Sequence, residues 1–300
     1  MTWKFTIVDV YTERPLAGNQ LAVFHDAHEI PEPLLLLLAR EVGFAETVFL
    51  YPPSLDGDAR VRIFSPNAEL PYAGHPLVGA AAVIGDAQGK AEVRLETAAG
   101  TIPIQLVRDR GHTVGVLRRP VPTVSPWRDP EPLLAALGVK ASTLPIEMYD
   151  AGLQMVYVGL ESRDQLRELH PDFWALGRIM NERGITNVGV NVFAGHDEGW
   201  KLRMFFVTRT VMEDPGSGSA VGPLAVHLVR HGEAETGVEL DIRQGAEIGR
   251  PSVLHATVFG QPDRIERVEV AGGTQIVGRG EFFQDVLATL LEPGSPVLRP

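Results

Sequence analysis

The chain has 300 residues, of which 44% are hydrophobic, and it carries a formal net charge of −11. This length suggests two domains, and the negative charge argues against a nucleic-acid or anionic-membrane partner. The sequence contains no cysteine, which excludes disulfides, cysteine–zinc sites and thiol nucleophiles.

The first half of the chain predicts a domain of mixed strands and helices. Its N-terminal ten residues alternate like a strand and lack the apolar core of a signal peptide. Strands are predicted at 5–10, 20–24, 46–51 and 60–64, helices at 31–42 and 76–84, and a hairpin at 92–97 and 101–107. The helix at 76–84 has almost no polar face, so we expect it to be buried.

The second half repeats this order of elements. Strands are predicted at 155–159, 188–193, 201–207, 238–243 and 252–259, a buried helix at 220–231, and helical stretches within 162–183 that break near His170-Pro171. A proline-rich linker at 118–129 is expected between the halves. The tail predicts a hairpin at 267–270 and 274–277 around Gly272-Gly273, then a short helix near 282–291. The longest apolar run, 34–39, is too short to cross a bilayer, and we expect a cytoplasmic protein.

Sequence motifs recur in the two halves in the same order. Residues 69–75 read E-x-P-x-x-G-H, and residues 213–219 read E-x-P-x-x-G-S. Such repetition at a long period indicates two duplicated units, with a cleft between them where a small molecule binds. The motifs align Glu46 with Asn187, His75 with Ser219 and Leu70 with Asp214, so the polar side chains that differ between the halves are candidates for chemistry.

Two glycine-rich turns, Gly74-His75-Pro76 and Gly216-Ser217-Gly218-Ser219, open the two buried helices. A helix N-terminus offers free backbone N–H groups and a partial positive charge. Two such ends facing one cleft would hold a carboxylate. The alternative is that the glycines only allow close packing, and the duplication favours the ligand-binding interpretation.

Glu46 lies among apolar neighbours at the start of a predicted strand. Burial favours the neutral form of such a carboxyl group, which suits a general acid/base. The alternative is an outward-facing residue on an edge strand. His75 and Asp214 each have a structural alternative as well, as a core histidine and as a helix-capping acid.

Several other classes of site are disfavoured. Gly216, Gly218 and Gly222 have the wrong spacing for a dinucleotide fingerprint, and neither Ser217 nor Ser219 lies in a G-x-S-x-G motif. His227 and His231 are separated by Leu-Val-Arg and therefore lack the glutamate of H-E-x-x-H. We expect no metal site.

The motifs together resemble the PhzF family of phenazine-biosynthesis isomerases. The resemblance rests on 15–24 (PLAGNQLAVF), 62–66 (RIFSP), 69–77 (ELPYAGHPL) and 213–220 (EDPGSGSA), with 245–252 (GAEIGRPS) and 278–280 (GRG), and it covers nearly the whole chain. It implies the α+β fold of diaminopimelate epimerase, in which two pseudo-symmetric domains each wrap a sheet around a central helix. The expected domains are 1–118, to which a C-terminal strand in 274–300 returns, and 119–273. The resemblance also implies a homodimer without metal or cofactor.

The resemblance further implies isomerisation of trans-2,3-dihydro-3-hydroxyanthranilate, with residue roles carried over by position. Glu46 matches the acid/base that moves a proton from C3 to C1, while His75 and Asp214 match residues that hold the polar groups of the substrate. Asn19 matches a substrate-side asparagine. Three further positions match the carboxylate cradle: Gly74, Gly218 and Ser219.

Two departures leave alternatives open. The segment around Glu46 reads A-E-T-V, and residues 215–217 read P-G-S, where phenazine enzymes more often have other small residues. The chain could therefore be an isomerase or tautomerase of another small amino or hydroxy acid, or a non-catalytic protein that binds one. Epimerases of this fold usually use two thiols, and the absence of cysteine excludes that mechanism here.

Overall fold

The computed structural model describes residues 2–109, 112–196, 199–207, 211–288 and 290. The chain divides into two compact units, the first made of 1–117 with 273–300 and the second of 118–272. Within the described residues no helix is long and apolar enough to cross a membrane.

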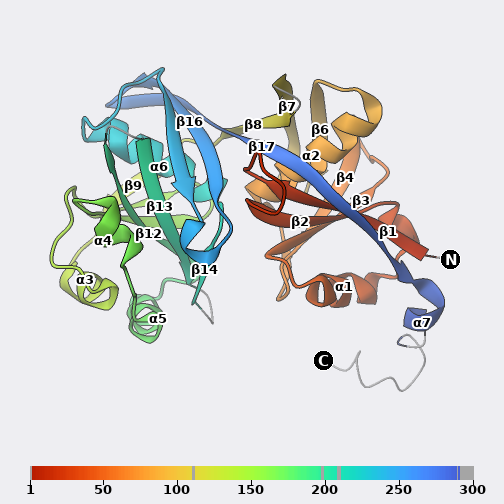
Figure 1. Ribbon diagram of the computed structural model, residues 1–300, viewed down its shortest axis with the longest axis horizontal. Coiled ribbons are helices and arrows are strands. Elements are labelled where there is room, and N and C mark those ends of the chain that lie inside the picture. Colours follow the sequence, from red (N-terminus) through yellow and green to blue (C-terminus); the bar gives the residue numbers. More distant parts are fainter. Residues whose placement is uncertain (1, 110–111, 197–198, 208–210, 289, 291–300) are drawn as a thin grey trace. The chain divides into compact units, whose positions relative to one another are not determined.

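Unit 1 contains a mixed sheet in which most neighbours are antiparallel (Figure 1). Strand β1 pairs antiparallel with β2, β2 is parallel to β3, and β3 continues antiparallel to β4 and β5. Strand β4 is also parallel to β6, which continues antiparallel through β7 to β8. The strands are β1 (Thr2–Val10), β2 (Asn19–Phe24), β3 (Glu46–Tyr51), β4 (Ala59–Phe64), β5 (Glu69–Leu70), β6 (Glu92–Thr97), β7 (Gly100–Asp109) and β8 (His112–Arg119).

Helix α2 (Gly74–Gln88) is the central helix of unit 1 (Figure 1). It contacts β1, β2, β3, β6 and β7, and every residue from Gly74 to Gly85 is buried. Its small side chains permit this enclosure: a Cβ at Gly79 would approach Leu21 to 2.5 Å. The prediction of a buried helix is therefore confirmed.

Helix α1 (Leu35–Val42) is amphipathic and covers a second apolar cluster of unit 1, which includes Phe24, Phe49 and Phe64. The predicted helix at 31–42 begins later than expected because Glu32–Leu34 forms a 3-10 turn. Two further 3-10 turns span Ala27–Glu29 and Ala246–Ile248. Helix α7 (Gln284–Ala288) lies within the predicted tail helix, whose positions 289 and 291 fall outside the described residues.

Unit 2 repeats the pairing order of unit 1. Strand β10 is antiparallel to β11, β11 is parallel to β12, β13 is antiparallel to β12 and β14, and β13 is parallel to β15. Helix α6 (Gly218–Arg230) corresponds to α2, is buried along its length and contacts β11 and β16. The strands are β9 (Thr123–Pro126), β10 (Glu147–Asp150), β11 (Gln154–Gly159), β12 (Val188–His196), β13 (Gly199–Val207), β14 (Val211–Asp214), β15 (Glu239–Gln244), β16 (Ser252–Gln261) and β17 (Arg264–Phe283).

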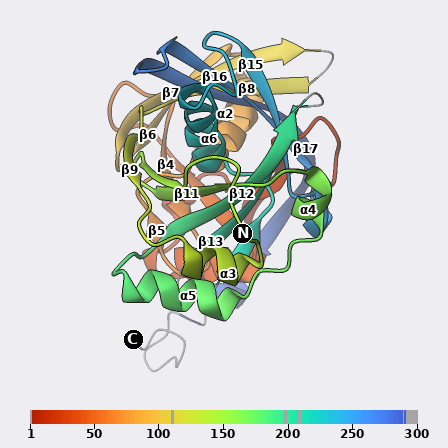
Figure 2. The same ribbon diagram turned by 90° about the vertical axis from the view of Figure 1, so that its left-hand side faces the viewer.

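Three further helices belong to unit 2: α3 (Glu131–Leu137), α4 (Arg163–Arg167) and α5 (Phe173–Glu182). Helices α3 and α5 contact each other and lie side by side in Figure 2. The break between α4 and α5 confirms the predicted interruption near His170-Pro171. Helix α3 and strand β10 were not predicted, because both are short and have no clear hydrophobic period.

The predicted tail hairpin around Gly272-Gly273 is wrong, because β17 continues straight through these glycines. Its first part pairs with β16 and its second part pairs with β1. At Gly273 the backbone of β17 lies close to the backbone of Thr12 and makes no turn. The Gly273 carbonyl accepts a hydrogen bond from Thr12 N at 2.9 Å, and a Cβ at Gly273 would lie 2.7 Å from the Thr12 oxygen. The predicted linker at 118–129 is shorter than expected, since this range contains the end of β8 and all of β9.

The strand registers correct the sequence alignment of Glu46 with Asn187. Glu46 is opposite Leu21 in the β2–β3 pair. In the β11–β12 pair Gly189 is opposite Met155, and Met155 corresponds to Leu21 because residues 18–21 (GNQL) and 152–155 (GLQM) match. The counterpart of Glu46 is therefore Gly189. Gly43 and Gly184 still match, with φ of 70° and 67°, so the difference arises because the loop that follows is longer in unit 2.

Candidate functional site

Three predicted site residues lie together in unit 1. The Glu46 Oε2 atom is 3.4 Å from His75 Nε2, and the Asn19 amide nitrogen is 3.4 Å from His75 Nδ1. His75 is 6% exposed and Glu46 is 19% exposed, while Asn19 is buried. The imidazole thus lies between the Asn19 amide and a partly exposed carboxylate.

Local structure fixes each member of this group. Asn19 is the first residue of β2 and Glu46 the first of β3, and the two strands are parallel neighbours. His75 lies in the first turn of α2. The turn into β2 requires a glycine, since Gly18 has φ of 71° and a Cβ there would lie 2.4 Å from the Val10 oxygen.

Burial keeps the imidazole neutral. It lowers the pKa of His75 to about 3, although a backbone hydrogen bond with Gln20 acts in the opposite direction. At neutral pH the 3.4 Å contact therefore joins a neutral ring to the Glu46 carboxyl group. A neutral imidazole can orient a carboxyl group or a substrate hydroxyl without adding a charge.

The first turn of α2 can hold an anion. Helix α2 begins at Gly74, and its N-cap residue, Ala73, provides no side-chain hydrogen bond to the backbone. The N–H groups of the first turn are thus not capped by their own N-cap side chain, and they carry the positive end of the helix dipole. Gly74 itself is buried.

In unit 2, Asp214 is the last residue of β14, just before α6. Its Oδ1 atom accepts a hydrogen bond from Gly216 N at 2.7 Å. Burial raises the pKa of Asp214 to about 6, and the Gly216 hydrogen bond offsets part of that increase. Asp214 therefore changes charge close to physiological pH, which suits proton transfer or a switch between donating and accepting a hydrogen bond.

Gly218 and Ser219 form the first turn of α6, and Ser217 caps it by accepting from Ala220 N at 3.3 Å. The Ser219 hydroxyl accepts a hydrogen bond from Arg119 Nη2 at 3.2 Å, and Arg119 is buried. Arg119 was not predicted, because it lies about a hundred residues away in the sequence at the end of β8.

Gln244 is a second residue that was not predicted from the sequence. Its side chain donates to the Asp214 carbonyl at 2.7 Å and accepts from Ser217 N at 3.2 Å. It is almost completely buried. Gln244 thus fixes the backbone on both sides of the turn from β14 into α6.

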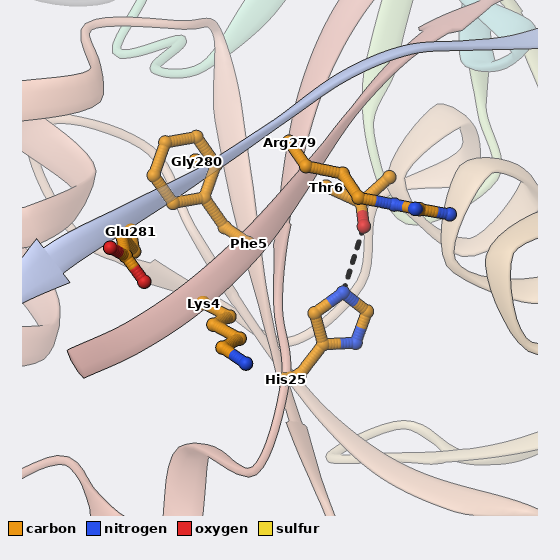
Figure 3. A pocket seen from close by; sticks show the side chains of 7 residues that line it. All are labelled: Lys4, Phe5, Thr6, His25, Arg279, Gly280 and Glu281. Atoms are coloured by element: carbon orange, nitrogen blue, oxygen red, sulfur yellow. Dashed lines mark hydrogen bonds between the residues drawn. The ribbon is translucent and has the colours of Figure 1, made fainter. Parts of the chain in front are cut away.

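A separate pocket of unit 1 contains none of the predicted residues (Figure 3). In this pocket the Thr6 hydroxyl and His25 Nε2 form a hydrogen bond at 2.8 Å. Its side chains include two cations and one carboxylate, but no group that the sequence analysis linked to chemistry. The lining residues are Lys4, Phe5, Thr6, His25, Arg279, Gly280 and Glu281.

The structure thus brings Asn19, Glu46 and His75 together in unit 1, with Gly74 beginning the same helix as His75. Asp214, Gly218 and Ser219 lie around the start of α6 in unit 2. Each unit supplies one buried-helix N-terminus and at least one ionisable side chain with a strongly shifted pKa.

This architecture defines the class of protein. It matches a solved hydroxyproline epimerase from Agrobacterium vitis with a TM-score of 0.64 at 14% identity, over 95% of this chain and 93% of that one. A Bacillus anthracis phenazine biosynthesis protein of the PhzF family matches with a TM-score of 0.83 at 25% identity, over 94% and 99%. The predicted α+β fold of the diaminopimelate epimerase type is confirmed.

The family follows from the sequence. The family model PhzC-PhzF, described as "Phenazine biosynthesis-like protein", matches residues 8–280. The chain is 42% identical to the trans-2,3-dihydro-3-hydroxyanthranilate isomerase of Pseudomonas aeruginosa, over 93% of this chain and 99% of that protein. It is 43% identical to the enzyme of the same name from Pseudomonas fluorescens, over 92% and 98%. The chain therefore belongs to the PhzF family and is an isomerase.

Proposed function

We propose that the protein isomerises trans-2,3-dihydro-3-hydroxyanthranilate with Glu46 as its general acid/base. The observation that carries this proposal is the identity of 42–43% to enzymes of that name over at least 92% of the chain. The contact between Glu46 and the buried His75 supports it, because it provides one carboxylate next to a neutral hydrogen-bonding ring.

In the proposed reaction the Glu46 carboxylate removes the proton from C3, the carbon that bears the hydroxyl group. The ring double bonds shift, and the same carboxyl group returns the proton to C1. The resulting enol at C3 becomes a ketone. One base can reach both carbons on one face of the ring, and the position equivalent to Glu46 in the repeat is Gly189, which has no side chain that could act as a base.

The other residues have binding roles in this proposal. His75 and Asn19 hold the polar groups of the substrate and orient Glu46, while Asp214 contacts a polar group of the same substrate. The backbone N–H groups at Gly74 and Gly218, with the Ser219 hydroxyl, bind its carboxylate. Variants in either unit should therefore lower the same kcat/KM.

The test compares Glu46→Gln with Glu41→Gln, a matched change at an exposed position at the end of α1. Removal of a general acid/base costs on the order of 10²–10⁴-fold, so Glu46→Gln should lower kcat by at least that much. The dissociation constant of a product analogue should change little, because the amide keeps the shape of the carboxyl group. Glu41→Gln should behave as the wild type.

Turnover by Glu46→Gln at more than about a tenth of the wild-type rate would refute the general acid/base role. If the folded wild type does not convert this substrate, the alternative of another small amino or hydroxy acid becomes the next candidate. We also propose a homodimer, as the family resemblance implies. Light scattering of the purified protein measures its molar mass in solution and thus distinguishes a dimer from a monomer.

A further inference from the structure

A cluster of polar side chains inside unit 2 takes no part in the proposed reaction. Glu147 and Tyr149 are alternate residues of β10, and His227 and His231 are one turn apart at the C-terminal end of α6. Alternate strand positions share a face, as do helix positions four residues apart. The strand and the helix therefore direct two pairs of polar side chains toward each other.

The donor atoms of this cluster are close together. The Glu147 Oε2 atom is 2.9 Å from His231 Nε2 and 3.4 Å from His227 Nδ1. The Tyr149 hydroxyl donates to Glu147 Oε2 at 2.8 Å and lies 3.0 Å from His227 Nδ1. All three carboxylate and imidazole atoms lie within 4.8 Å of one another.

The two separations from Glu147 Oε2 are close to those of a zinc-type coordination shell. Nitrogen and oxygen ligands bind Zn²⁺ at about 2.0–2.2 Å, so two ligands of one tetrahedral ion are roughly 3.3–3.5 Å apart. The observed 2.9 and 3.4 Å need only small side-chain adjustments to reach that spacing. Two histidines and one glutamate are also a known ligand set for zinc that leaves a fourth position for water.

The surroundings favour a cation. Both histidines lie in the last turn and cap of α6, where the helix dipole is negative. Glu147 and His231 are partly exposed, which provides a route for the ion.

We propose that Glu147, His227 and His231 form a binding site for a late first-row divalent metal ion of the zinc type. The ion would link β10 to the C-terminal end of α6 and stabilise unit 2. This proposal is independent of the proposed isomerase activity, because none of the three residues belongs to the proposed site.

Two neighbours affect the site. The metal would replace the Tyr149 hydroxyl as the partner of His227 Nδ1. Tyr149 would still donate a hydrogen bond to Glu147 and so orient this ligand. Arg230 Nη2 is 3.7 Å from Glu147 Oε1 and opposes a cation. Its side chain is 35% exposed, so it can turn toward solvent when the ion binds.

The test is titration of the metal-free full-length protein with Zn²⁺ by calorimetry and with Co²⁺ by visible absorption. The chain has no cysteine, so thiolate ligands cannot contribute to the Co²⁺ spectrum. We expect one equivalent to bind with the absorption of a four-coordinate ion and to raise the Tm. His231→Gln should weaken binding more than about 100-fold, beyond the 10- to 100-fold effect of an outer-shell partner. Tyr149→Phe should fall within that smaller range.

A matched control lies on the surface of unit 2, where His255 forms a second three-residue group with Glu239 and Asp241. These side chains are 28–62% exposed, and His255→Gln should leave the tight site unchanged. Glu147→Gln provides a second ligand variant, and circular dichroism verifies the fold of each. Absence of tight binding, or binding that His231→Gln and Glu147→Gln leave intact, would overturn the proposal, as would an equal loss in His255→Gln.

Discussion

Burial shifts the pKa values of two candidate site residues in opposite directions. It lowers the pKa of His75 to about 3 and raises that of Asp214 to about 6, because in both cases the charged form loses its hydration. His75 is consequently a neutral hydrogen-bonding group throughout the physiological range. Asp214 is the residue whose protonation changes there.

We predict that Asp214 adds stability as the pH falls below about 6, whereas His75 acts in the opposite direction, because its folded-state pKa of about 3 lies below the ordinary value of 6.5. The folded-state pKa of Asp214 lies above the ordinary value of 3.8, so the folded protein takes up this proton first as the pH falls. Stability from this group should therefore rise as the pH falls through about 6 toward 3.8. The Asp214→Asn variant should lack this gain.

Urea unfolding of the wild type and Asp214→Asn at about pH 7.5 and about pH 5 measures the difference directly. The wild type should gain stability relative to the variant at the lower pH. A constant difference, or one of opposite sign, would contradict the assigned pKa shift. The ring resonances of His75 should not titrate over the same range.

Equivalent elements of the two units contain the same ion pair in different surroundings. In β13 and β14, Arg203 and Glu213 form two hydrogen bonds of 2.8 and 2.7 Å and are 9% and 8% exposed. In β4 and β5, the corresponding pair of Arg62 and Glu69 has exposures of 20% and 44%. The duplication thus offers an internal comparison of a buried and a partly exposed pair.

We predict that Glu213→Ala destabilises the protein by about 3–5 kcal/mol, because it leaves the Arg203 guanidinium buried without its carboxylate. Among the described residues, Arg203 would then keep its hydrogen bonds to the carbonyls of Leu166 and Leu169. Glu69→Ala should cost only about 0–1 kcal/mol, as is usual for exposed pairs. Denaturant unfolding of both variants measures the two costs, and equal values would contradict this account.

Sequence patterns predicted the regular elements well where one physical signal dominated. The two buried helices were recognised because they have almost no polar face, and the β6–β7 hairpin because its strands flank a glycine turn. The hairpin predicted at Gly272-Gly273 was wrong, because glycine occurs both in turns and where two backbone segments approach closely. Only the position of Thr12 shows which of the two applies.

The site was predicted in part for a related reason. Asn19, Glu46 and His75 could be proposed from motifs, and the structure brings them into contact. Arg119 and Gln244 could not, because each supports the start of α6 from a distant strand that no local pattern links to it. The counterpart of Glu46 was also misassigned, because a change in loop length is invisible until the strand register is known.

At the scale of the whole molecule, unit 1 is made of two separate stretches of the chain, whereas unit 2 is one continuous stretch between them. Strand β17 begins in unit 2 and ends in unit 1, where it pairs with β1 from Thr2 to Val10. Strand β8 crosses the unit boundary in the other direction, and β9 then pairs with β10. Strands β8 and β17 therefore each lie partly in one unit and partly in the other.

We predict that a fragment of residues 1–117 does not fold, because β1 would keep its pairing with β2 but lose its pairing with β17, which leaves an apolar edge of the sheet open. Joining residues 273–290 to this fragment by a flexible linker should restore cooperative unfolding. Circular dichroism with thermal unfolding distinguishes the two fragments. Cooperative unfolding of 1–117 alone, at the same Tm as the joined fragment, would show that the β1–β17 pairing is dispensable.

The most direct test of the central claim is NMR of the purified protein with trans-2,3-dihydro-3-hydroxyanthranilate in D₂O. We predict rapid loss of the C3–H signal and formation of the ketone in the wild type, and neither in Glu46→Gln. The isotope found at C1 then reports whether Glu46 exchanges its proton with solvent between the two steps. An unchanged C3–H signal in the folded wild type, or equal conversion by Glu46→Gln, would contradict the account.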